Sequence, residues 1–105
     1  MGPGLMESVY EECLILELAL RGVEAERQVH TPLKYKGQEL RTMLRTDLIV
    51  QNSLLVEVKS VDKLAPIHDA QVLTYLKLTG LPVGLLLNFN ETLLKNGIKR
   101  LANGF

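Results

Sequence analysis

The sequence predicts an α+β fold in which helices flank a mixed central sheet. Apolar residues recur at helical spacing near the N-terminus, and residues 24–61 then alternate at the period of a strand. A second helical segment separates this stretch from a later apolar run. The predicted order is therefore helix, three strands, helix, strand. With 47% apolar and 23% charged residues, residues 1–105 are expected to form a single globular domain.

The first predicted helix runs up to Gly22, a residue type that commonly follows a helix. Glu7 lies at the edge of its apolar stripe, where it either reaches inward over the sheet or complements the helix dipole. Glu11 and Glu12 are expected to face solvent, and Cys13 is expected to be a buried, inert thiol. The stripe itself contains Leu5, Met6, Val9, Tyr10, Cys13, Leu16 and Leu20.

Two long strands follow the helix and form a predicted hairpin. The Lys36-Gly37-Gln38 segment has the composition of the connecting turn. A second turn at Gln51-Asn52-Ser53 leads into a third strand from Leu54 to Val61. The three strands are expected to form an antiparallel meander.

The third strand carries charged residues where an ordinary core strand carries valines. Glu57 and Lys59 share one face because side chains alternate, whereas Val56 and Val58 point to the other face. If Asp47 comes from the neighbouring strand, two carboxylates and one lysine converge. Such oxygen ligands suit Mg²⁺ near a substrate phosphate. The alternative is a cross-strand salt bridge on a solvated sheet face.

The second predicted helix runs from Pro66 to Thr79 and ends at Gly80. Gln71 and Tyr75 place an amide and a phenol on a helix face that is otherwise expected to be apolar. The alternatives are an amide satisfied by the backbone and an aromatic ring at the edge of the core. The full face contains Ile67, Gln71, Thr74, Tyr75 and Leu78.

The C-terminal part contains a strand that is expected to be buried on both faces. The continuous apolar run V-G-L-L-L-N-F follows Pro82, and a helix between it and the meander implies a mixed sheet. Leu93 and Leu94 are expected to belong to a helical turn, followed by an edge strand near residues 97–102.

The formal net charge of zero argues against strong non-specific binding to nucleic acid, because such binding depends on clustered Lys and Arg. Residues 31–52 and 71–105 are nevertheless each net basic. A two-fold homodimer would widen this basic surface and protect an edge strand. The single cysteine and the lack of a long apolar run predict a cytoplasmic protein without a membrane segment.

Several short segments together resemble the GxxExxY family. They are G-L-M-E-S-V-Y, E-R-Q-V, Y-K-G, R-T-D-L-I-V, V-E-V-K, A-Q-V-L-T-Y-L-K-L-T-G and G-I-K-R, and they cover nearly the whole chain. That family is similar to a compact branch of the PD-(D/E)XK nuclease superfamily, which has a restriction-endonuclease-like αβββαβ core. The resemblance implies a divalent-metal-dependent phosphodiester hydrolase that uses Mg²⁺ or Mn²⁺ and acts on nucleic acid. DNA is the expected type of nucleic acid.

The resemblance also implies roles for individual residues. Asp47 and Glu57 would hold the metal ion, with help from the carbonyl group of Val58. Glu7 would be the carboxylate that many members carry on the first helix. Lys59 would be the superfamily lysine, which orients or helps to deprotonate the attacking water.

Two further residues match a helix motif of the exonuclease-like branches, Q-x-x-x-Y. Gln71 and Tyr75 would then hold the nucleic-acid backbone or the scissile phosphate. Thr46 stands where the superfamily has a proline. A second function class stays open, namely a catalytically silent module of the same fold that binds nucleic acid or a protein partner.

Overall fold

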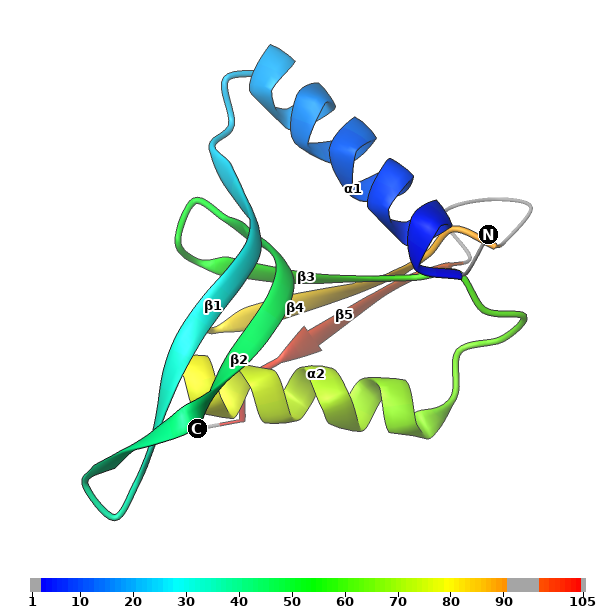
Figure 1. Cartoon of the computed structure of the whole chain (residues 1–105). Helices are drawn as coiled ribbons and strands as arrows, with labels where there is room; N and C mark the ends of the chain where they lie inside the picture. Colours follow the sequence, from blue (N-terminus) through cyan, green and yellow to red (C-terminus); the bar gives the residue numbers. More distant parts are fainter. Residues whose placement is uncertain (1–2, 91–96, 105) are drawn as a thin grey trace.

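The computed structural model describes residues 3–90 and 97–104 and contains a five-stranded sheet with α1 and α2 on opposite faces (Figure 1). The elements, in chain order, are α1 (Pro3–Leu20), β1 (Ala25–Tyr35), β2 (Gln38–Val50), β3 (Leu54–Lys59), α2 (Pro66–Thr79), β4 (Val83–Asn88) and β5 (Ile98–Ala102).

The sheet is mixed, as the sequence predicts. Its strand order is β1-β2-β3-β4-β5, and β1, β2 and β3 form an antiparallel meander. α2 connects β3 to β4, which pair in parallel, and β5 pairs antiparallel with β4 at the edge. The predicted edge strand is thus confirmed, whereas the helical turn predicted at Leu93 and Leu94 lies outside the described residues.

Both predicted turns of the meander are confirmed, and each has two consecutive residues with positive φ. Lys36 and Gly37 have φ values of 50° and 77°, and Gln51 and Asn52 have values of 50° and 56°. The two-residue connection Lys36-Gly37 matches the twist of β1 and β2, and the three-residue connection Gln51-Asn52-Ser53 joins β2 to β3. The second connection sets the register of β2 against β3.

The core lies on both faces of the sheet. On the α1 face, buried Leu48, Val56 and Val58 pack against half-buried residues of α1, among them Tyr10, whose ring stacks on Phe89 at 4.3 Å between centroids. On the α2 face, the buried cluster consists of Leu55, Val72, Leu76 and Leu86. Successive residues of β3 therefore serve opposite faces, as the strand period requires.

The predicted apolar stripe of α1 is partly wrong. Leu16 and Leu20 are 62% and 74% exposed, and Cys13 is exposed rather than buried. Glu11, which was expected to face solvent, is only 3% exposed. The reason is that α1 packs on the sheet through a neighbouring stripe of its surface, which contains Tyr10, Leu14, Ile15 and Leu18.

The predicted face of α2 is also partly wrong. Val72 and Leu76 form the buried face, whereas Ile67 and Leu78 are 74% and 49% exposed. Gly84 on β4 allows this close packing, because a Cβ atom there would lie 2.7 Å from Val72 Cγ1. No helix in the described part of the chain is long and apolar enough to span a membrane.

Candidate active site

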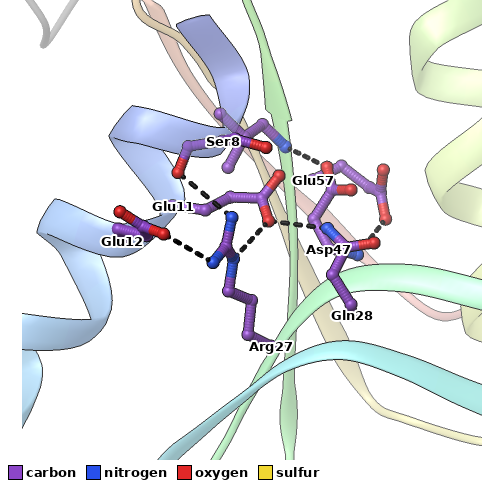
Figure 2. Close-up of polar contacts among 8 residues, drawn as sticks. Ser8, Glu11, Glu12, Arg27, Gln28, Asp47 and Glu57 are labelled. Atoms are coloured by element: carbon purple, nitrogen blue, oxygen red, sulfur yellow. Dashed lines mark hydrogen bonds and ion pairs between the residues drawn. The ribbon is translucent and has the colours of Figure 1, made fainter. Parts of the chain in front are cut away.

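Asp47 and Glu57 lie side by side where β2 and β3 stop pairing (Figure 2). Register pairing between the two strands extends only as far as Leu48 and Val56. Beyond that pair, Asp47 Oδ2 accepts a hydrogen bond from the Val58 N–H at 2.8 Å, and the Asp47 N–H donates to Glu57 Oε1 at 3.2 Å. Carboxylate oxygens thus replace backbone carbonyls in the ladder. The two acidic groups are thereby brought together between the strands.

The electrostatics of this pair are unusual because Glu57 is only 4% exposed. Burial, and after it the negative charge of Asp47, raises the pKa of Glu57 from 4.5 to about 8. The positive charge of Lys59 acts in the opposite direction but does not offset these effects. In the absence of a cation, Glu57 therefore holds a proton at neutral pH.

The donor set at this point fits a hard divalent cation. Two carboxyl groups and nearby backbone carbonyls supply only oxygen ligands, and a cation between Asp47 and Glu57 would take the place of the proton. Among the described residues, no group of three or more His, Cys, Asp or Glu side chains is placed to hold a metal ion. A sparse protein ligand set of this kind suits an ion such as Mg²⁺, which usually keeps several waters.

Lys59 is half-buried at the end of β3 and shares a strand face with Glu57. Its carbonyl oxygen accepts a hydrogen bond from the Phe89 N–H at 3.0 Å, which anchors the end of the strand on β4. None of the ion pairs found among the described residues includes Lys59. The cross-strand salt bridge considered from the sequence is therefore not formed.

A polar cluster beside Asp47 was not predicted from the sequence (Figure 2). Buried Glu11 accepts hydrogen bonds through Oε1 from Gln28 Nε2 at 2.6 Å and from Arg27 Nε at 3.1 Å. Arg27 also pairs with Glu12 at 3.2 Å. Gln28 has a φ of 52° and lies opposite Asp47, at a position where the pairing of β1 with β2 is interrupted. The consecutive polar residues of the E-R-Q-V segment were the available signal.

This cluster and Asp47 of the carboxylate pair border a common cavity of about 390 Å³. Its lining residues are Glu7, Ser8, Glu11, Arg27, Gln28, Arg45 and Asp47. Glu7 and Asp47, which the sequence predicts as candidate site residues on different elements, therefore line the same cavity. A larger hollow of about 550 Å³ at the C-terminal end of α1 is lined by none of the predicted site residues.

Gln71 and Tyr75 are half-buried neighbours on α2, and Gln71 Nε2 donates a hydrogen bond to Tyr75 Oη at 2.9 Å. Tyr75 packs against the cluster that contains Leu55, which shares its strand face with Glu57. The two residues thus lie on the Glu57 side of the sheet. No hydrogen bond between described residues joins them to Asp47 or Glu57.

Thr46, next to Asp47, is fully buried, and within the described part of the chain its Oγ1 has no hydrogen-bond partner. Its side chain faces the same side of the sheet as Leu48, away from Asp47. Thr46 therefore contributes to the packing under α1.

Comparisons with known proteins give the family of this chain and support its fold. The model of the PD-(D/E)XK nuclease superfamily matches residues 1–101. The chain is similar to the crystal structure of SSO0001, with a TM-score of 0.72 and 21% sequence identity over 97% of this chain and 52% of that one. The chain thus spans about half the length of that protein, and the likeness shows a fold consistent with a restriction-endonuclease-like core. No curated protein matches it. This chain belongs to the PD-(D/E)XK nuclease superfamily.

Proposed function

We propose that this chain is a divalent-metal-dependent phosphodiester hydrolase that acts on nucleic acid, of the GxxExxY type. The observation that carries the proposal is the contact between half-buried Asp47 and buried Glu57, whose carboxyl groups take the place of backbone pairing between the strands. The buried carboxyl group of Glu57 and the half-buried carboxyl group of Asp47 repel each other when both are ionised, so the arrangement costs stability unless a proton or a cation lies between them. Packing of the core does not require two carboxyl groups in contact, so it does not explain this cost in stability.

Asp47 and Glu57 would hold Mg²⁺ or Mn²⁺, together with the carbonyl oxygen of Val58. The bound ion would supply charge stabilisation for the non-bridging phosphate oxygens. The fixed strands hold both carboxyl groups in place before substrate arrives, because Asp47 is tied to Val58 and Glu57 to Asp47. Little reorganisation is then needed on binding.

Lys59 would orient the attacking water and stabilise charge at the reacting phosphate. This role is supported by its half-buried position on the face of Glu57 and by the lack of an ion-pair partner among the described residues. Glu7 would act beside the metal from the shared cavity. It would contact the ion directly or accept a hydrogen bond from a water molecule beside the ion.

Gln71 and Tyr75 would contact the nucleic-acid backbone. Their mutual hydrogen bond uses one amide N–H and leaves the second N–H of Gln71 and the Tyr75 hydroxyl hydrogen as donors for phosphate oxygens. Tyr75→Phe would remove one donor and keep the ring packing. It should weaken substrate binding without changing metal affinity, which separates this role from that of the carboxylates.

A second candidate is a module of the same fold that binds nucleic acid or a protein without cutting it. The observation in its favour is that only two carboxyl groups meet at the strand ends, with no third acidic, His or Cys side chain placed to complete a metal site among the described residues. Cleavage of single-stranded, duplex and branched DNA and of RNA with Mn²⁺ decides between the two. Loss of cleavage in Glu57→Gln supports the enzyme, and metal binding without cleavage of any of them supports the module.

We propose a cytoplasmic setting and a two-fold homodimer as the working form. The exposed edge strand β5 and the net basic C-terminal residues 71–105 are the features that support a dimer. Sedimentation equilibrium tests the proposed homodimer independently of the proposed chemistry. A monomer at high protein concentration would remove the dimer and leave the proposed chemistry untouched.

A further inference from the structure

The β1–β2 hairpin extends beyond the rest of the sheet as a two-stranded ribbon (Figure 1). β2 pairs with β3 only between Leu48 and Val50, so residues 30–45 have no third strand beside them. Every residue from Gln38 to Met43 is exposed. An isolated hairpin of this kind is marginally stable in water, and the exposed end of this ribbon is available as a contact surface. We call residues 30–45 the arm.

The arm carries a concentrated positive charge. It contains four basic side chains and one acidic side chain, in a protein whose formal net charge is zero. None of the four basic residues takes part in the ion pairs found among the described residues. Tyr35, Leu40 and Met43 add exposed apolar surface, at 63%, 43% and 49% exposure. The basic residues, all exposed, are Lys34, Lys36, Arg41 and Arg45.

The arm leads directly to the candidate active site. Arg45 and Asp47 are two residues apart on β2 and therefore project from the same face of the strand. Both line the cavity of about 390 Å³. A phosphate backbone that follows the basic residues of the arm toward the sheet would thus reach the Asp47–Glu57 pair.

We propose that the arm is a docking element for duplex DNA and lies in its major groove. This inference rests on the proposed function and narrows its substrate class to double-stranded DNA. The major groove of B-DNA admits a two-stranded β-ribbon, whereas the major groove of A-form RNA is too narrow and deep. Lys and Arg at the ribbon edges meet phosphates, and the apolar side chains contact thymine methyl groups and sugars.

The experiment compares two double variants with the same loss of charge. Lys34→Gln/Arg41→Gln removes one lysine and one arginine from the arm. Lys77→Gln/Arg100→Gln removes the same residue types from α2, which packs on β4 and β5, and from β5, which is at the opposite edge of the sheet from β1. Both control residues are exposed and absent from the ion pairs of the described residues. Binding of a short fluorescent DNA duplex is measured by anisotropy in EDTA over a range of KCl concentrations.

The arm variant is expected to bind the duplex at least about tenfold more weakly than the control variant. Its plot of log affinity against log salt should be shallower by about 0.9 for each phosphate that the arm no longer neutralises. In a second variant, Asn-Gly replaces residues 33–42. This variant should lose the preference for duplex over single-stranded DNA, and its circular dichroism spectrum should show that it remains folded. This shortening retains the observed pairing of Pro32 with Met43.

Equal affinity and equal salt slopes in the arm and control variants would overturn the proposal. So would absence of duplex binding by the wild type, or an arm-dependent preference for duplex RNA over DNA. If shortening the arm converts a dimer to a monomer and leaves DNA binding unchanged, the arm binds a second copy instead. Because binding is measured without metal, a failure of cleavage does not affect this result, and cleavage without arm-dependent binding would retain the proposed function alone.

Discussion

The carboxyl groups of Asp47 and Glu57 extend the contact between β2 and β3 beyond the last paired backbone residues. Asp47 accepts the Val58 N–H at 2.8 Å, while its own N–H donates to Glu57 at 3.2 Å. The same two bonds that join the strands therefore place two acidic groups next to each other. Whatever binds between them, a proton or a cation, also affects the stability of the strand junction.

Mn²⁺ binding should depend on Asp47. Asp47→Ala removes one proposed ligand and also the acceptor for the Val58 N–H, so we expect the heat of Mn²⁺ binding in calorimetry to disappear. Asp62→Ala is the control, because Asp62 is an exposed acid outside the cavity. Identical heats and stoichiometry for wild type and Asp47→Ala would show that the ion binds elsewhere.

Lys59 should affect chemistry and not metal affinity. Lys59→Ala is expected to lower phosphodiester cleavage by about a hundredfold or more, while Mn²⁺ affinity is kept or slightly raised because a nearby positive charge is gone. Lys63→Ala removes a nearby exposed lysine and should leave the rate unchanged. Glu57→Ala should lose both metal and cleavage. Activity equal in all the variants would indicate a contaminating nuclease.

The metal-free protein should lose stability as pH rises. The folded state keeps a proton on Glu57 up to its pKa of about 8, whereas the unfolded chain releases it near 4.5. The folded state therefore binds more protons between these values, and the free energy of unfolding falls by on the order of a few kcal/mol as pH rises through this window.

Urea unfolding in EDTA at several pH values measures this effect. Glu57→Gln, which is neutral at every pH, should remove most of the slope, whereas Glu24→Gln at an exposed site should keep it. Added Mn²⁺ should stabilise the wild type more at pH 8 than at pH 6, because metal binding displaces the proton. A wild-type slope that survives in Glu57→Gln would assign the proton to another group.

Two glutamates on α1 should differ in their contribution to stability. Glu11→Ala leaves Gln28 without its side-chain partner, and we expect a loss of about 1–3 kcal/mol. Glu17→Ala breaks an exposed pair with Arg21 and should cost less than about 1 kcal/mol. Chemical unfolding of both variants tests the difference. Similar losses would mean that the buried cluster adds no more stability than a surface pair.

Gly84 should not tolerate a methyl group. In Gly84→Ala the new Cβ would lie 2.7 Å from Val72 Cγ1, so α2 must move away from β4 at a cost of about 1–3 kcal/mol. Gly104→Ala, where nothing lies within 4 Å of the new atom, serves as the control. Thermal unfolding compares the two, and an unchanged melting temperature for Gly84→Ala would contradict the close packing of α2.

Local patterns in the sequence were enough to predict the elements and their order. The Lys36-Gly37 and Gln51-Asn52 turns, the proline that begins α2 and the glycine that ends it act through backbone dihedral angles and need no distant contacts. The alternation around Glu57 likewise predicted which residues of β3 share a face. The same strand pattern suggested that Asp47, Glu57 and Lys59 converge, and the family resemblance then implied a role for each of them.

Only the tertiary structure decided which stripe of each helix is buried and which polar groups meet. Glu11 faces inward because α1 rests on the sheet through Tyr10 and Leu14, and a helix with apolar residues on more than one side does not reveal this from its own pattern. Gln28 lies opposite Asp47 because strand register brings together residues far apart in sequence. Burial and proximity to Asp47 then raise the pKa of Glu57, since both effects depend on distances that the chain acquires only on folding.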